Sequence, residues 1–411
     1  MSPISTTLMT ELFQGGDAGK AAASQIADQV KSSGAPLDAS TVAALAEALC
    51  ESSKGTAAKR EGACFAVEAI ISKGRAAAEH QMAPLVAHLV HCCADKHSKE
   101  VQAASSAALT ALAKTMSAHG LRTILGHLLA AMDPKEKWQT MCGALHMVAT
   151  LAECSPGSVS EALNDIIPVV TQMVNDSKAE VSVAARDCLS KICGSIDNRD
   201  VEPFIPNLVA ATIDHEQVPD CVQRLASTTF VQTVTAAPLA LIAPLLILGF
   251  RVRSTATKRM CAVIIDNMSK LVEDPEDAAP FLPKLMPALE KASEEISDPE
   301  ARTVCGKAYE QLKSIDVKLK ENASRKAARD AVHKEVMKSC GAACAKDAGK
   351  AEYLTAVVCS LVNCKVEDAD EWTDALSPFG VTEAGAKACR KAMAAMYFTE
   401  AAEEAEEEEE E

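Results

Sequence analysis

The chain has 411 residues, of which 48% are hydrophobic and only 3% aromatic, and its net charge at pH 7 is −16. Cores of small aliphatic residues favour packed helices over strands, and no apolar run reaches the roughly 18 residues of a membrane span. The N-terminus lacks the basic and apolar regions of a secretory signal. We therefore expect a cytoplasmic protein whose 16 cysteines are reduced thiols.

A proline or a glycine recurs inside an apolar run about every forty residues. The intervals are 42, 42, 38, 38 and 39 residues, along Pro84, Gly126, Pro168, Pro206, Pro244 and Pro283. Because these residues start, end or bend helices, the spacing indicates a repeated building block. A second amphipathic pattern follows each one, such as "KEVQAASSAALTAL" from Lys99. Two helices in about forty residues are typical of HEAT or armadillo repeats, which stack into an α-solenoid.

In chain order, the pattern predicts a capping helix pair near residues 5–34, followed by seven repeats. The repeats are expected at 41–72, 80–116, 121–153, 161–195, 202–236, 240–273 and 279–316. The repeated proline is expected near the start or at a bend of each first helix, where its missing amide is tolerated. In the alternative, it is a loop residue just before the helix. The second helices are expected to begin at Lys59, Lys99, Glu136, Lys178, Pro219, Thr257 and Asp298.

The period stops near residue 320, and charged and apolar helical patterns follow. We predict an all-α protein with a HEAT-repeat α-solenoid over 1–320, a small helical bundle over 321–398 and a disordered acidic tail over 399–411. The tail contains nine glutamates, so the rest of the chain carries a charge of −7. The tail either only solvates the protein or competes with RNA for its basic residues.

Several segments resemble translation elongation factor 3. The longest is "AVIIDNMSKLVEDP" from Ala262, and the others are "TELFQ" from Thr10, "KWQ" from Lys137 and "DNRDVEPFIPNLV" from Asp197. The resemblance covers about residues 7–320 and continues more weakly through 330–398. It implies a HEAT domain, a helical bundle and an acidic linker. It also implies a role in translation elongation, with contacts to the ribosome at the small-subunit head and near the central protuberance of the large subunit.

That family is a ribosome-bound ATPase, but this sequence lacks a phosphate-binding loop. Each Gly-Lys pair, at 19–20, 306–307 and 349–350, is followed by Ala and has no glycine five residues before its own. No catalytic constellation stands out elsewhere. We therefore expect no enzymatic activity, no cofactor and no small-molecule substrate. Both a HEAT-only relative and a fragment of a longer factor fit this pattern.

Binding to ribosomal RNA needs Lys and Arg side chains that neutralise phosphates. The loop "GFRVRSTATKR" contains Arg251, Arg253, Lys258 and Arg259, and "KGTAAKR" contains Lys54, Lys59 and Arg60. Lys258 and Arg259 belong to the stretch that resembles the family, whereas Arg251 and Arg253 are this chain's own. Matching turns contain Lys96, Lys99, Lys135, Lys137 and Lys178. Together these residues predict a basic ridge along one edge, unless they are simply solvated turn residues. The ten candidates are Arg251, Arg253, Lys258, Arg259, Lys54, Lys59, Arg60, Lys99, Lys137 and Lys178.

Three further features have alternative readings. Trp138 either fills a gap between repeats or stacks on a base. The stretch "HLVHCCADKH" contains residue types that suit zinc, but its spacing matches no zinc finger, and "CGAAC" lacks a second thiol pair. We therefore predict no metal site. The alternative function is a general HEAT scaffold for proteins, of the tubulin-binding or transport-receptor-like kind.

Overall fold

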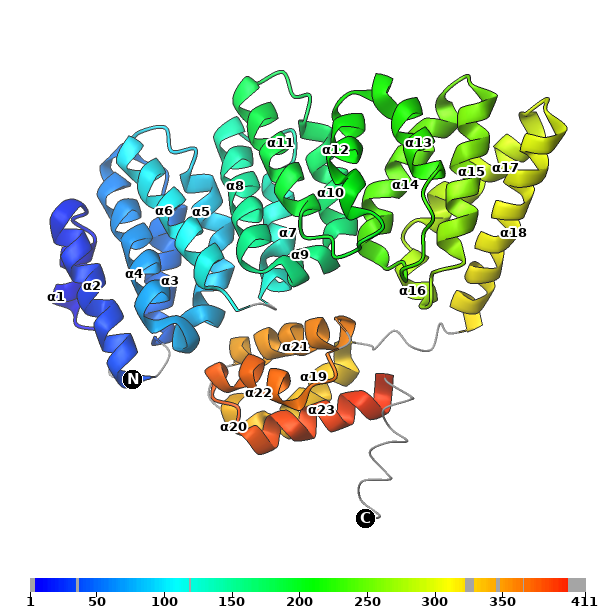
Figure 1. Ribbon diagram of the computed structural model, residues 1–411. Helices are drawn as coiled ribbons and strands as arrows, with labels where there is room; N and C mark the ends of the chain where they lie inside the picture. Colours follow the sequence, from blue (N-terminus) through cyan, green and yellow to red (C-terminus); the bar gives the residue numbers. More distant parts are fainter. Residues whose placement is uncertain are drawn as a thin grey trace, which may run out of the picture. The chain divides into compact units, whose positions relative to one another are not determined.

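The computed structural model describes residues 4–34, 37–117, 120–321, 329–344, 348–364 and 366–397. Every regular element among these residues is a helix (Figure 1), which confirms the all-α prediction. Contacts divide the chain into two compact units, one formed by Met1–Ser158 with Ala327–Glu411 and the other by Val159–Lys326. The short helix α9 (Pro156–Glu161) spans the boundary between them. None of the described helices is long and apolar enough to cross a membrane.

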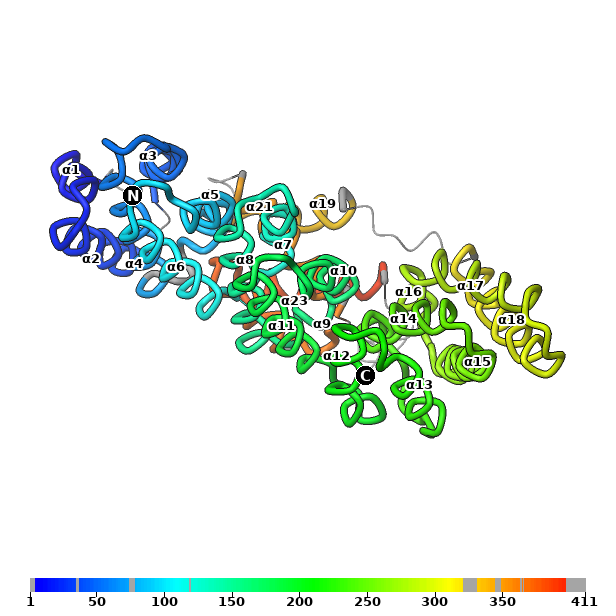
Figure 2. The backbone as a smooth tube through the Cα atoms, turned by 90° about the horizontal axis from the view of Figure 1, so that it is seen from above, coloured from blue at the N-terminus to red at the C-terminus, as the bar shows by residue number. Residues whose placement is uncertain are grey.

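The first unit begins with antiparallel helix pairs. They are formed by α1 (Thr6–Leu12) with α2 (Gly16–Ser33), α3 (Ala39–Cys50) with α4 (Ala57–Met82), α5 (Val86–Cys92) with α6 (Lys99–Thr115), and α7 (Leu121–Ala131) with α8 (Trp138–Cys154). The short 3-10 helices η1 (Lys54–Thr56) and η2 (Ala83–Leu85) precede α4 and α5. Helices α2, α4, α6 and α8 contact one another in sequence, and α3, α5 and α7 form the second layer (Figure 2). The predicted cap and the first three repeats are confirmed.

The pattern of α6 shows why these helices form and stack. Ser98 accepts a hydrogen bond from the Val101 amide at 3.2 Å and so caps the helix. Ala108 and Leu112, one turn apart, are fully buried. Small residues also allow close approach on α4. A Cβ atom at Gly62 would lie only 2.0 Å from the carbonyl oxygen of Leu12, so a side chain there would separate α4 from the cap.

The second unit contains the four remaining repeats. They pair α10 (Leu163–Met173) with α11 (Ala179–Cys193), α12 (Ile205–Ile213) with α13 (Val218–Ala226), α14 (Ala236–Arg251) with α15 (Thr255–Ser269), and α17 (Leu282–Glu295) with α18 (Pro299–Glu321). The short helices η3 (Glu202–Phe204), η4 (His215–Gln217) and α16 (Pro275–Ala278) lie in the connections.

The repeated prolines take both of the predicted positions. Pro206 and Pro283 lie in the first turns of α12 and α17. Backbone amides in a first turn have no acceptor within the helix, so a proline there removes no helical hydrogen bond. Pro168 and Pro244 lie inside α10 and α14. Pro84 lies in η2, just before α5. The same sequence signal therefore marks either the start or the interior of a first helix.

One predicted second helix is shorter than expected. The pattern from Pro219 predicts a helix through residue 234, but α13 ends at Ala226. The following segment is rich in threonine and valine, which favour extended backbone. Asp200 Oδ2 accepts hydrogen bonds from the amides of Val231 and Gln232, at 2.7 and 2.8 Å, and the Val234 amide donates to the carbonyl of Leu271. Partners distant in sequence thus replace the helical hydrogen bonds.

The C-terminal helices complete the first unit. They are α19 (Arg329–Ser339), α20 (Gly341–Cys344), α21 (Ala348–Asn363), α22 (Ala369–Leu376), η6 (Ser377–Phe379) and α23 (Glu383–Tyr397). Trp372 is fully buried in this bundle, and its Nε1 donates to the carbonyl of Val366 at 2.7 Å. The predicted tail, 399–411, lies outside the described residues.

Tyr353 on α21 joins the bundle to the first repeats. Its hydroxyl donates to Oε1 of Glu79 at 2.5 Å, and the same oxygen accepts from the amide and the hydroxyl of Ser117 at 2.8 Å. Burial, followed by the Glu79 carboxylate, raises the pKa of Tyr353, so the hydroxyl stays a donor. The compact units thus group the bundle with the first repeats, whereas the predicted boundary near residue 320 rests on the end of the repeat period. That three-part division stays a prediction.

Candidate nucleic-acid interface

The predicted cations of the first unit lie at the turns that lead into second helices. Lys54 is in η1, Lys59 is in the first turn of α4, Lys99 begins α6 and Lys137 precedes α8. All four side chains are exposed. Backbone amides at a helix N-terminus carry partial positive charge, so a lysine there adds to the attraction for an anion such as phosphate.

These four lysines differ in how they are held. Lys59 Nζ lies 3.4 Å from Glu51 Oε1, and Lys137 Nζ donates to the carbonyl of Ala94 at 3.3 Å. Lys54 and Lys99 form no ion pair with a described residue. Among these four lysines, Lys54 and Lys99 are therefore the two whose charge is least neutralised by described residues.

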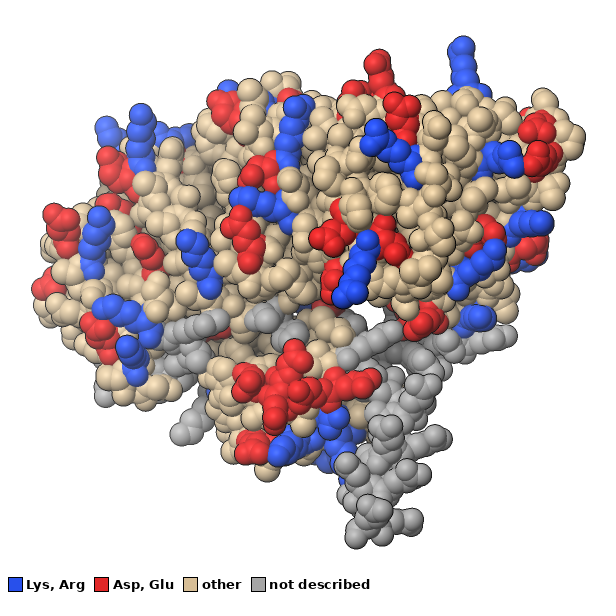
Figure 3. All heavy atoms as spheres, viewed as in Figure 1, with Lys and Arg blue, Asp and Glu red and all other residues tan. Residues whose placement is uncertain are grey.

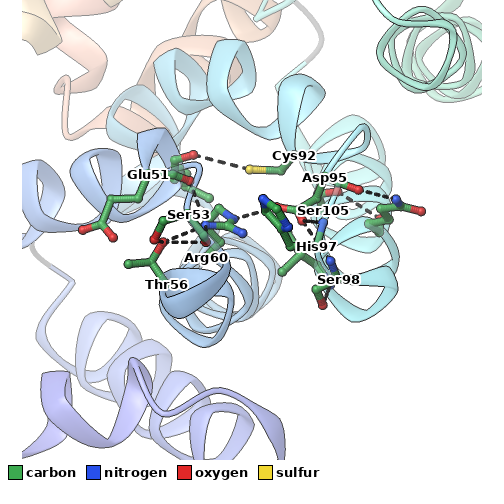
Figure 4. Close-up of polar contacts among 12 residues, drawn as sticks. Glu51, Ser53, Thr56, Arg60, Cys92, Asp95, His97, Ser98 and Ser105 are labelled. Carbon is green, nitrogen blue, oxygen red and sulfur yellow. Dashed lines mark hydrogen bonds and ion pairs between the residues drawn. The ribbon is translucent and has the colours of Figure 1, made fainter.

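The structure corrects the prediction for Arg60. Its side chain is only 2% exposed, and its Nε lies 2.7 Å from Oδ2 of Asp95 in the turn before α6 (Figure 4). Its Nη1 donates to the carbonyls of Glu51 and Ser53, both at 2.9 Å, and to the Thr56 hydroxyl at 2.8 Å. The guanidinium therefore ties one repeat to the next, and it is not available to a phosphate on the surface.

Asp95, the partner of Arg60 in this ion pair, is itself held in place by backbone amides. Its Oδ1 accepts hydrogen bonds from the amides of His97 and Ser98, at 2.7 and 2.9 Å. Burial alone would raise the pKa of Asp95, but the His97 amide, Arg60 and the Ser98 amide together lower it. The carboxylate is thus held in its charged form at neutral pH.

The aspartate at this turn is a repeated signal that the sequence analysis missed. In the matching turns an aspartate Oδ1 accepts the amide two residues further on, and it does so at Asp95, Asp133, Asp176, Asp214 and Asp298. Aspartates favour such turns because the carboxylate replaces a backbone acceptor. Their spacing of about forty residues is visible in the sequence and marks the same turns of the repeats as the lysines.

In the second unit, the basic cluster surrounds the start of α15. Arg251 ends α14, and both it and Arg253 are exposed, while Lys258 is half-buried. None of these three cations forms an ion pair with a described residue. Arg259 is exposed as well, but its Nη2 lies 2.5 Å from Oε1 of Glu300 in the first turn of α18.

Lys178 lies at the remaining candidate turn. It precedes α11, is exposed, and its Nζ lies 3.9 Å from Glu180 Oε2. On the face shown in Figure 3, lysines and arginines alternate with acidic residues. Several candidate cations likewise lie beside an acidic side chain, as Lys59, Lys178 and Arg259 do. A continuous basic ridge stays a prediction. In the 251–259 turn, three of the four candidate cations have no acidic partner among the described residues, and the fourth, Arg259, pairs with Glu300.

The remaining candidates are placed as follows. Trp138 begins α8 with its side chain 36% exposed, so it is not a core residue. Cys92 and Cys93 are buried. Across the described part of the chain, no group of three or more His, Cys, Asp or Glu side chains is arranged to hold a metal ion.

Comparison with known proteins bears on both units. Residues 19–189 match the family model "EF3 N-terminal HEAT repeat", and residues 216–324 match "Elongation factor 3/GNC1 HEAT repeat". These stretches belong to the elongation factor 3 family. They include all ten candidate cations, six in the first match and four in the second.

Individual elongation factor 3 proteins show the same relationship. The chain is 42% identical to elongation factor 3 of Phytophthora infestans over 61% of this chain and 24% of that protein. It is 36% identical to elongation factor 3 of Mycosarcoma maydis over 81% of this chain and 32% of that protein. The chain thus spans about a quarter to a third of the length of these curated relatives. Among solved structures, it is similar to Kap121p bound to Pho4p at 12% identity and a TM-score of 0.34, covering 91% of this chain and 40% of that one.

Proposed function

We propose that this elongation-factor-3-like HEAT array binds the ribosome in the cytoplasm during translation elongation. The observation that carries the proposal is the turn around the start of α15, where Arg251, Arg253 and Lys258 have no acidic partner among the described residues. Unpaired cations at a helix N-terminus suit a phosphate backbone, because charge and backbone amides attract the same group.

The overall charge shapes how such binding would work. A chain with a net charge of −16 repels RNA at long range. Binding must therefore come from local cations at short distance, and salt should weaken it. The proposed contact points are the small-subunit head and the central protuberance, as the family resemblance implies. In this proposal the described repeats bind rather than catalyse.

The test is co-sedimentation of the chain with purified ribosomes over a potassium chloride series from about 50 to 200 mM. The test variant changes Arg251, Arg253 and Lys258 to Glu. A control variant with the same charge change replaces Lys284, Lys291 and Lys307, which lie elsewhere in the second unit. We expect the test variant to bind more weakly and to flatten the slope of log affinity against log salt by about two to three.

A general protein scaffold is the second candidate function. An open groove between α13 and α15 favours it, because small and apolar residues such as Ala226, Ala256 and Val263 line it next to Arg259. Absence of pelleting at every salt concentration would reject ribosome binding and favour this scaffold. Equal loss in the test and control variants would reject the α15 turn as the contact.

A further inference from the structure

Two exposed cysteines occupy matched positions in the first unit. Cys50 is the last residue of α3 and Cys154 is the last residue of α8. Both thiols are free and exposed. Any difference in reactivity between the two thiols is therefore expected to come from the side chains around them.

Among the described residues, a histidine ring lies within hydrogen-bonding distance of the Cys50 thiol but not of the Cys154 thiol. Cys50 Sγ lies 3.3 Å from Nδ1 of His88 on the neighbouring helix α5. No hydrogen bond joins the Cys154 thiol to a described residue. Cys50 is thus a thiol with a potential base in contact, whereas Cys154 is an ordinary surface thiol.

His88 is a neutral imidazole in contact with the thiol. It is half-buried, and burial, followed by the nearby His91 and His127, lowers its pKa. The ring is therefore neutral at physiological pH. In the tautomer that carries its proton on Nε2, Nδ1 can accept the proton of the Cys50 thiol.

Most of the other described thiols are expected to be less reactive than the Cys50 thiol. Burial raises the pKa of Cys93 to about 11 and that of Cys261 to about 12. These groups stay protonated at neutral pH and are shielded from reagents.

We propose that Cys50 and His88 form a base-assisted reactive thiol, a modification site for small-molecule disulfides. The thiol proton moves to His88 Nδ1 while Sγ attacks one sulfur of the disulfide. A new disulfide bond forms at Cys50, and the original S–S bond breaks. The departing thiolate takes the proton back from His88, so atoms and electrons balance without another oxidant.

The test treats the 411-residue chain at pH 7.4 with glutathione disulfide and follows each cysteine by peptide mass spectrometry. We expect Cys50 to react about tenfold faster than Cys154, because a positioned base accelerates thiol attack. His88→Asn keeps a polar side chain of similar size but removes the base, and should lower the Cys50 rate to that of Cys154. His146→Asn, on the same helix as Cys154, is the matched control and should change neither rate.

Two results would overturn the proposal. The first is an equal rate at Cys50 and Cys154 in the unaltered chain, which needs no variant to fold. The second is an unchanged Cys50 rate in His88→Asn, with helical content verified by circular dichroism.

The modification has a consequence that rests on the proposed function. Glu51, the residue after Cys50, pairs with Lys59 at 3.4 Å, so an anionic adduct at Cys50 adds negative charge beside the first basic turn. We expect the glutathione adduct to weaken ribosome pelleting by a few fold at low salt. Unchanged pelleting of the adduct would reject this consequence, whereas absence of pelleting by the unmodified chain would reject the ribosome proposal itself.

Discussion

The two basic loops of this protein, residues 51–60 and 251–259, occupy the same place in their repeats but use their charge differently. Each loop leads into a second helix, α4 or α15. In the first, Arg60 turns inward and pairs with Asp95, whereas in the second Arg251 and Arg253 extend into solvent. A cation in a repeat turn is therefore not in itself a binding signal. Its position on the helix face and the partner in the next repeat decide its role.

The largest expected difference between the loops is in stability. Arg60→Ala leaves the buried Asp95 carboxylate without its cation, and we expect it to lower the free energy of unfolding by about 3–5 kcal/mol. Arg253→Ala removes an exposed side chain and should change it by less than about 0.5 kcal/mol. Urea denaturation followed by circular dichroism measures both. Equal effects of the two variants would show that the loops do not differ.

Acid should weaken the first loop selectively. The pKa of Asp95 lies below its ordinary value of 3.8 in the folded protein, so its contribution to stability is present above that pH. The contribution is lost as pH falls through the lower folded value. Asp95→Asn should therefore flatten the decline in stability below about pH 4, as measured by denaturation at a series of pH values. A decline of the same steepness in the variant would contradict this role.

The loops should also differ in ribosome binding. We expect Arg251→Glu with Arg253→Glu to weaken pelleting about tenfold at low salt, because both cations are exposed and unpaired. Lys54→Glu with Lys59→Glu makes the same charge change but should cost less, since Glu51 already partly neutralises Lys59. A greater loss from the first loop would reverse the proposed ranking.

The smallest effect concerns Arg259. Its partner Glu300 is exposed, and such surface pairs contribute about 0–1 kcal/mol. Glu300→Ala should release Arg259 and strengthen ribosome pelleting by up to about fivefold at low salt. Glu294→Ala removes the same charge from the end of α17 and is the control. Equal gains from both variants would point to net charge alone.

The sequence alone determined the repeat and its helices. The period of prolines, the amphipathic patterns and the turn residues all involve neighbours within one repeat, so local rules suffice to predict them. The resemblance to the family is also visible in the sequence, in "AVIIDNMSKLVEDP", and the family models confirm it. The repeated turn aspartates can also be found in the sequence alone, because they follow the same period of about forty residues.

Only the tertiary structure decided the features that depend on distant partners. Arg60 turns inward because Asp95 lies 35 residues away in the next repeat. Helix α13 ends early because Asp200 and Leu271 bind the backbone that follows it. Tyr353 meets Glu79 across 274 residues and so joins the bundle to the first repeats. A local pattern gives each residue its helix and its face, but burial and pairing depend on what the fold places against that face.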